Sequence, residues 1–187
     1  MTSPLYIYSA NWGLRDVTNI VRQNITESSD GGEEVVVGLS VSSATFPHAG
    51  YLPPDYVKVL TVVWGYDNVN YMTTVKSDGS TLTIEPSSVV KPTKPPNENT
   101  VNVLGASYGL GVETSPLQGA VTSDQYGSYL TVAATSSEFP NPTVYPPRKT
   151  LFVVWREGVA VLGQPYTNVY SSVVKQGETI KIAYLCG

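Results

Sequence analysis

The stretch Lys58-Val59-Leu60-Thr61-Val62-Val63-Trp64 decides the fold, because both of its alternating faces are rich in apolar side chains. Successive residues of a strand point to opposite faces. One face of this strand would carry leucine, valine and tryptophan, and the other would carry valine, threonine and valine. A strand with two apolar faces is covered on both sides. We therefore predict that this stretch is the central strand of a buried sheet.

The same stretch returns as Lys149-Thr150-Leu151-Phe152-Val153-Val154-Trp155, and other short segments also recur in the same order. The order and spacing predict a tandem duplication, with one copy at 1–86, a proline-rich linker at 87–100 and a second copy at 101–187. The other matched segments are Ala10–Leu14 with Ala106–Leu110, Leu39–Val41 with Leu130–Val132, Phe46-Pro47 with Phe139-Pro140, Pro53-Pro54 with Pro146-Pro147, and Gly79–Ile84 with Gly177–Ile182.

The composition favours strands joined by tight turns. Only 14% of the 187 residues are charged, while the chain has 13 Tyr, 16 Gly and 14 Pro. This bias, with alternating apolar patterns, predicts an all-β protein made of two tandem antiparallel β-sandwich, Ig-like domains. A copy of about 90 residues buries only a limited share of its surface when it folds alone, so we expect the two copies to pack against each other. Apolar spacing near Val17–Ile25 suits a helix, but Pro116 in the second copy would interrupt one, so we expect an irregular segment or one turn.

Several classes of function are disfavoured. The net charge is −4 with no basic run, so we expect no nucleic-acid partner. The chain has one His and one Cys, too few for a structural zinc site, and we expect no metal and no cofactor. No apolar run is long enough to span a bilayer. The N-terminal stretch lacks a secretory pattern, so a cytoplasmic location is expected.

A resemblance to a known module rests on Ala10-x-Trp12-Gly13-x-x-Asp16-Val17-Thr18, Phe46 and Lys58-x-Leu60-x-Val62. The chain resembles a small all-β module from the C-terminal region of some mitochondrial DnaJ-type co-chaperones and from free-standing proteins of unclear role. Two departures are Val112-Glu113 at the second-copy counterpart of Asp16-Val17, and Ser43-Ala44-Thr45 where an Asn-centred turn is expected. The resemblance implies a β-sandwich binding module, and it carries no catalytic residue.

Six of the eight candidate binding residues lie in two proline-stiffened loops that precede the repeated strand, and two lie at the turns that contain Gly13 and Gly109. Tyrosine rings can cover the apolar face of a sugar, while amide and carboxylate groups take its hydroxyls. Tyrosines at strand ends can also have a purely structural role, because they favour half-buried positions of a sheet. The aromatic residue before the turn glycine, Trp12 or Tyr108, could either fill the core or present an exposed ring to a ligand. Trp64 and Trp155 are expected in the core. The candidates are His48, Tyr51, Asp55 and Tyr56 in the first loop, Asn141 and Tyr145 in the second, and Trp12 and Tyr108 at the glycine turns.

These features predict a non-enzymatic, lectin-like protein with one weak carbohydrate site in each copy, strengthened by bivalency. The alternative is a protein–protein interaction or structural module of the co-chaperone-associated type, which predicts an exposed apolar patch or a free edge strand. A homodimer is compatible with either. Catalysis by the lone histidine, His48, is disfavoured because the second copy has Pro142 and Thr143 in this region.

Overall fold

The computed structural model of the chain describes residues 4–47, 52–66, 70–86, 100–139, 148–159, 161 and 163–185. We call residues 4–86 the first half and 100–185 the second half. The described part of the first half ends two residues after the last strand, and the second half begins at Thr100. The body of the expected linker, 87–99, therefore lies outside the described residues.

The prediction of an all-β protein is confirmed, since strands dominate the described chain and pair in antiparallel sheets. The first half contains β1 (Tyr6–Trp12), β2 (Arg15–Asp16), α1 (Thr18–Arg22), β3 (Thr26–Glu27), β4 (Glu34–Ser40), β5 (Val59–Gly65), β6 (Met72–Ser77) and β7 (Thr81–Ile84). The second half contains β8 (Val101–Tyr108), β9 (Gly111–Val112), α2 (Thr114–Gly119), β10 (Thr122–Asp124), β11 (Gly127–Ala133), β12 (Thr150–Glu157), β13 (Val169–Lys175) and β14 (Thr179–Leu185).

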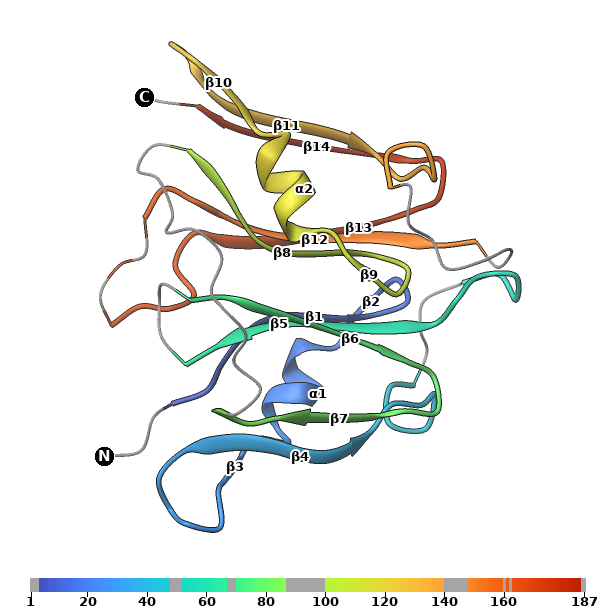
Figure 1. Cartoon of the computed structure of the whole chain (residues 1–187), viewed down its shortest axis with the longest axis vertical. Helices are drawn as coiled ribbons and strands as arrows, with labels where there is room; N and C mark the ends of the chain where they lie inside the picture. The colour runs from blue at the N-terminus through green and yellow to red at the C-terminus, as the bar shows by residue number, and fades with distance from the viewer. Residues whose placement is uncertain are drawn as a thin grey trace.

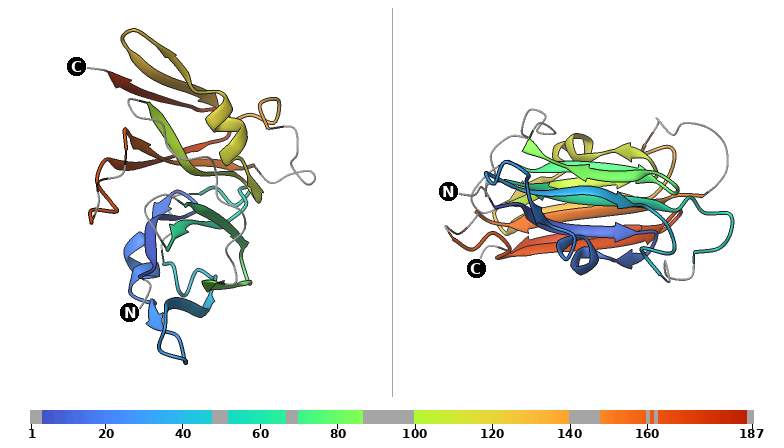
Figure 2. Two further views of the ribbon diagram at one scale, coloured as in Figure 1. Left: turned by 60° about the vertical axis from the view of Figure 1, so that its left-hand side comes forward. Right: turned by 90° about the horizontal axis from the view of Figure 1, so that it is seen from below.

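The sheets stack as four layers (Figures 1 and 2). The first half has a four-stranded sheet of order β2-β1-β5-β6 and a three-stranded sheet of order β3-β4-β7. The second half has sheets of order β13-β12-β8-β9 and β10-β11-β14. The four-stranded sheets lie in the middle and the three-stranded sheets lie outside. Each half thus encloses a core between its two sheets, and a third apolar cluster joins the halves.

The repeated strand is central, as predicted. β5 lies between β1 and β6, and all its residues are buried. Its Leu60, Val62 and Trp64 enter the core of the first half, whereas Val63 enters the cluster between the halves. In β12, Leu151 and Val153 similarly face the core of the second half. The second apolar face of each strand is therefore covered by the other half of the chain.

Each middle sheet contains a register shift that directs a large side chain into the contact between the halves. In β1 the shift lies between Ile7 and Ser9, and in β8 it leaves Leu104 without a partner in the β12 register. An extra residue in one strand bends the strand and re-aims its side chain. The two extra residues, Tyr8 and Leu104, are both buried in the cluster between the halves. Matched bulges thus help to form the contact.

Equivalent local hydrogen bonds occur inside each of the two halves. The amide of Ala10 donates to the Thr18 hydroxyl at 2.8 Å, and the amide of Ala106 donates to the Thr114 hydroxyl at 3.0 Å. Next to these, aromatic rings pair in both cores, Trp12 with Phe46 and Tyr108 with Phe139. The first threonine ties the start of α1 to β1, and the second ties α2 to β8. Matched sequence segments therefore make matched contacts.

The segment near Val17 matches the second of the two expected forms closely, because each half has a helix there of little more than one turn. α1 has five residues and α2 has six. Pro116 does not interrupt α2, because it is the third residue of the helix. The amide groups of the first turn have no partner within a helix, so a proline there removes no hydrogen bond.

Gly105 permits the close approach of the middle sheets. A Cβ atom at this position would lie less than 3.0 Å from both methyl groups of Val63 and from the Thr73 hydroxyl. These atoms belong to β5 and β6 of the other half. Thr73 is also within hydrogen-bonding distance of Thr114, at 3.2 Å between hydroxyl oxygens. The position therefore requires glycine for steric reasons, although its φ angle is not positive.

We expect Gly105→Ala to lower the free energy of unfolding by about 1–3 kcal/mol, the usual cost of overpacking a core. Gly119→Ala is the matched control, because a Cβ atom there meets nothing within 4 Å. It should leave stability unchanged or raise it slightly, since alanine favours helices. Urea denaturation of the full chain measures both effects. Equal stability of the two variants would show that the halves do not pack as closely as described.

Tyr66 links the two sheets of the first half at the end opposite the repeated loops. Its hydroxyl donates to the Glu34 carbonyl at 2.7 Å, and its ring packs edge-on against Trp64. Burial raises the pKa of Tyr66 to about 12, and the carboxylates of Glu33, Glu85 and Glu34 add to the rise. The neutral phenol is thus favoured by folding. The resulting contribution to the free energy of unfolding is complete below pH 10, the pKa of tyrosine in the unfolded chain. It is lost as the pH rises towards about 12, the pKa of Tyr66 in the folded chain.

Tyr66→Phe should lower the free energy of unfolding by about 1 kcal/mol at neutral pH, because one hydrogen bond is lost. The difference between wild type and variant should shrink as the pH rises from about 10 to about 12, because only the wild type loses the Tyr66 contribution. Urea denaturation across this range measures it. The exposed Tyr126, substituted in the same way, is the control. A constant difference at alkaline pH would contradict the assignment.

Candidate functional site

The described ends of the two predicted loops lie side by side. Tyr56 and Arg148 form a parallel β-bridge. The Val57 amide donates to the Arg148 carbonyl at 2.9 Å, and the Arg148 amide donates to the Asp55 carbonyl at 2.7 Å. A loop end from the first half is thus hydrogen-bonded to a loop end from the second. We call the group formed around this bridge the loop junction, with residues Asp55, Tyr56, Tyr108, Arg148, Lys149 and Gln176.

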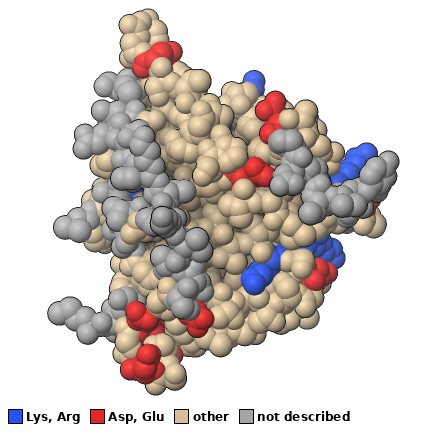
Figure 3. Space-filling model, in the orientation of Figure 1, with Lys and Arg blue, Asp and Glu red and all other residues tan. Residues whose placement is uncertain are grey.

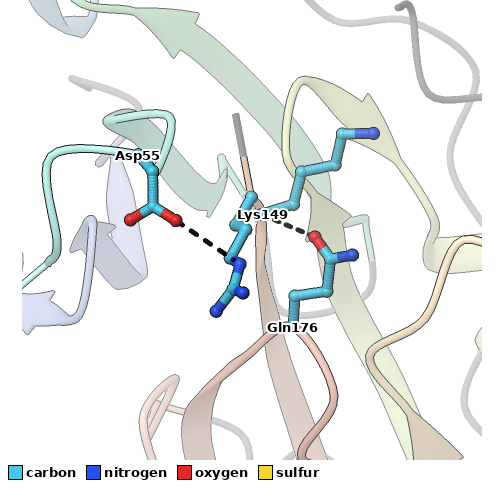
Figure 4. A network of polar contacts seen from close by, with 4 residues as sticks. Asp55, Lys149 and Gln176 are labelled. Atoms are coloured by element: carbon cyan, nitrogen blue, oxygen red, sulfur yellow. Dashed lines mark hydrogen bonds and ion pairs between the residues drawn. The ribbon is translucent and has the colours of Figure 1, made fainter. Parts of the chain in front are cut away.

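An exposed ion pair lies at the loop junction (Figure 4). The Arg148 Nε lies 3.4 Å from Asp55 Oδ2. The side chains are 63% and 56% exposed, respectively, so solvent reaches both charges. Exposed pairs of this kind contribute about 0–1 kcal/mol. Both groups can therefore exchange this contact for a ligand at little cost.

Lys149 and Gln176 extend the polar surface beside Arg148 (Figure 4). The backbone N–H of Lys149 donates to the side-chain Oε1 of Gln176 at 3.2 Å, and the backbone N–H of Gln176 donates to the Lys149 carbonyl at 2.9 Å. These reciprocal bonds fix the turn between β13 and β14 against the start of β12. The Lys149 side chain runs past Gly109, and its Nζ lies 5.6 Å from the centre of the Tyr108 ring. The backbone of Lys149 is thus fixed beside Arg148, and its ammonium lies by Tyr108 on the side away from the ion pair (Figure 4).

The two tyrosines of the loop junction are buried. Tyr56 is 7% exposed and Tyr108 is 3% exposed. The Tyr108 ring packs against Phe139, with ring centres 4.9 Å apart. Burial raises the pKa of the Tyr108 phenol, a hydrogen bond with Ser136 opposes the rise, and Tyr56 adds to it. Tyr56 and Tyr108 therefore pack beneath the surface of the loop junction and present no ring face to a ligand.

Trp12 lies in the core, which decides between the two interpretations of the glycine-turn aromatic. It is 0% exposed and packs against Phe46 with ring centres 5.7 Å apart. A buried ring cannot stack on a sugar, so the core-plug interpretation applies to Trp12. The core placement is confirmed for Trp64, which is 1% exposed, whereas Trp155 is only partly buried and packs against the edge of the second core.

The remaining candidates, His48, Tyr51, Asn141 and Tyr145, lie outside the described residues. Among the described candidates, the structure brings Asp55, Tyr56 and Tyr108 together and leaves Trp12 apart. Lys149 and Gln176 were not predicted as site residues. No sequence pattern links these two residues to Asp55, because the contact arises only when the two halves pack together.

The charges of the molecule are unevenly placed (Figure 3). On the face shown, the clearest Lys and Arg side chains lie towards the right-hand side, and a group of acidic side chains lies at the lower left. The acidic residues of the β3–β4 connection include Asp30, whose pKa is lowered by a hydrogen bond from Ser28. Acidic side chains also lie at the top of this face and beside the Lys and Arg side chains on its right-hand side, so both signs of charge occur there.

A second cluster, which the sequence did not predict, joins the halves at the other end of the sheets. Arg156 is 0% exposed and donates to the Tyr71 hydroxyl and the Pro165 carbonyl. Its guanidinium lies 5.8 Å from the Tyr8 ring centre and 5.5 Å from that of Tyr71. A guanidinium above an aromatic face is stabilised by the ring quadrupole. This cluster is a buried contact between the halves and presents little surface to a ligand.

Apolar side chains are exposed along the connection from β12 to β13. Val159, Val161 and Tyr166 are each 42% exposed, and Tyr170 at the start of β13 is 45% exposed. Tyr166 also lies under the Arg22 guanidinium, which is 4.2 Å from its ring centre. The corresponding connection of the first half, between β5 and β6, is shorter. This apolar connection is therefore a feature of the second half.

In the described part of the chain, neither helix is long and apolar enough to cross a membrane. Among the same residues, no three or more His, Cys, Asp or Glu side chains are grouped so that they could hold a metal ion.

Comparison with models of protein families, with curated proteins and with solved structures yields no match to this chain.

Proposed function

We propose that this protein is a non-enzymatic carbohydrate-binding protein and that its recognition surface is the loop junction. The observation that carries the proposal is the backbone pairing of Tyr56 with Arg148, which places exposed polar groups from both halves beside each other. Loops held on rigid strands are the usual place for binding residues. The proposal locates recognition where the halves meet.

The chemistry of the loop junction suits sugar hydroxyls. The Asp55 carboxylate accepts hydrogen bonds, the Arg148 guanidinium donates several in a fixed plane, and the Gln176 side chain contains an amide that can do both. Neighbouring hydroxyls of a sugar ring can donate a hydrogen bond to the carboxylate and accept one from the guanidinium. The proline pairs in the two loops reduce the conformational freedom lost on binding. These properties support a weak and specific polar site.

The shared position of the loop ends changes the expected valency. One site in each copy would be strengthened by bivalency. The bridge between Tyr56 and Arg148 instead supports a single composite site to which both halves contribute. A composite site depends on the packing of the middle sheets, because that packing fixes the distance between the loops. We therefore propose one site per chain.

We further propose that the halves are tandem copies of one Ig-like sandwich. The identical order of elements supports this proposal, as do the equivalent sheet orders. The paired threonine bonds to Ala10 and Ala106 and the paired aromatic contacts give further support. Shared contacts at matched sequence positions are expected when a unit has been copied.

We expect the full chain to bind sugars with dissociation constants in the millimolar range, because the charged groups of the site are polar and more than half exposed to water. Arg148→Ala should weaken binding at least about tenfold, since it removes a charge-assisted hydrogen bond. Lys181→Ala, an exposed cation on β14, is the matched control and should bind as the wild type does. A glycan array followed by calorimetric titration with free sugars measures these affinities. The proposal fails if no sugar binds at millimolar concentration, or if both variants bind equally well.

A second candidate function is binding to another protein through the apolar connection of Val159, Val161, Tyr166 and Tyr170. The specific observation in its favour is the exposure of these four side chains. An exposed apolar group of this kind is common at interaction sites. The adjoining strand β13 lies at the edge of its sheet, so a partner strand could also pair with it.

The double variant Val159→Ser, Val161→Ser should weaken binding to a protein partner and leave sugar binding unchanged, because it removes apolar surface far from the loop junction. Its control is Val37→Ser, at an exposed valine of the outer sheet. Affinity capture with wild type and variants, followed by sedimentation of the purified chain, measures this. Partners released only by free sugar would count against the second candidate.

A further inference from the structure

We propose that the ligand of the loop junction is an acidic glycan, and that its carboxylate or sulfate group replaces Asp55 on the Arg148 guanidinium. The inference rests on the proposed function and specifies the class of sugar. Asp55 would then act as an internal substitute for the ligand, holding Arg148 in place until an anion arrives.

Arg148 is positioned by its backbone on both sides. Its amide donates to the Asp55 carbonyl at 2.7 Å, and its carbonyl accepts from the Val57 amide at 2.9 Å. The side chain is 63% exposed, and its ion-pair contact is made through Nε to one carboxylate oxygen. A guanidinium can bind a carboxylate or a sulfate through two parallel hydrogen bonds. The contact with Asp55 therefore leaves donors available for a better-placed anion.

The cations of the loop junction outnumber its acids. Arg148 and Lys149 are adjacent in sequence, and Asp55 is the only acidic member of the junction as defined. Displacement of Asp55 would leave the Arg148 guanidinium free for the ligand, while the Lys149 ammonium, which lies by the Tyr108 ring on the side away from the ion pair, adds only to the net positive charge (Figure 4). An exposed ion pair favours the paired state by at most about fivefold. An incoming anion with two hydrogen bonds can exceed this preference.

A neutral sugar and an acidic sugar make opposite demands on Asp55. A neutral sugar would use its carboxylate as a hydrogen-bond acceptor, so loss of the charge would weaken binding. An acidic sugar would be repelled by this carboxylate and would compete with it for Arg148. The sign of the effect of Asp55→Asn therefore distinguishes the two classes without any need to know the natural ligand.

The experiment compares D-glucuronic acid, D-glucose 6-sulfate and D-glucose, which differ in the charged group on one ring. Titration calorimetry or ligand-observed NMR on the full chain would give the affinities of wild type, Asp55→Asn and Arg148→Ala. Asp78→Asn is the matched control, because it removes the same charge from an exposed turn at the same end of the molecule. Thermal unfolding of each variant verifies that it is folded.

We expect Asp55→Asn to tighten binding of at least one charged sugar by about fivefold, which is the preference of the exposed pair. Arg148→Ala should weaken it at least about tenfold, and Asp78→Asn should leave it unchanged. Raising the ionic strength should weaken binding of the charged sugars more than that of glucose. The better of the two charged sugars identifies whether a carboxylate or a sulfate is preferred.

Two results would overturn the inference while leaving the proposed function intact: glucose binding as tightly as the charged sugars, or Asp55→Asn failing to tighten binding of any charged sugar. Absence of binding by all three sugars and by a glycan array would overturn both the inference and the proposed function. Equal tightening by Asp55→Asn and Asp78→Asn would show a non-specific effect of net charge, which also contradicts a specific exchange at Arg148.

Discussion

The structure depends on one constraint: a strand with two apolar faces must be covered on both of them. β5 and β12 each bury the apolar side chains of one face in the core of their own half and those of the other face against the opposite half. Neither middle sheet would be stable in water with its second face uncovered, because apolar burial is the main force that stabilises folding. The four-layer stack follows from this requirement. The position of the loops then follows from the stack, since each loop leads into one of these strands.

The sequence predicted the features that depend on local pattern. The alternation in Lys58–Trp64 identified a central strand, and the recurrence at Lys149–Trp155 identified its counterpart. The matched segments Gly79–Ile84 and Gly177–Ile182 each lead into a strand, β7 at Thr81–Ile84 and β14 from Thr179. The pattern left open whether the segment near Val17 is irregular or one helical turn, because Pro116 suggests an interruption, although a proline in the first turn of a helix costs no hydrogen bond.

The features that depend on the packing of the two halves could not be predicted in the same way. Tyr8 and Leu104 reach the contact because of bulges, which shift the register by one residue and leave no clear mark in the alternation of apolar residues. The pairing of Tyr56 with Arg148 joins residues far apart in sequence. The sequence around Trp12 allows either a core plug or an exposed platform, and only the burial of Trp12 in the folded chain distinguishes them. Arg156 gives no sign in the sequence that it is buried among tyrosines.

The lack of a side chain at Gly105 also has a consequence for partner choice. The matched position of the first half is Ser9, which pairs with Val63 within its own sheet as Gly105 pairs with Val154. Only the glycine leaves room for the Val63 methyl groups of the facing sheet. Two first halves brought together face to face would present serine where this space is needed. Steric fit therefore favours pairing between unlike halves, which the continuous chain holds at a high local concentration, over pairing between like halves of separate molecules.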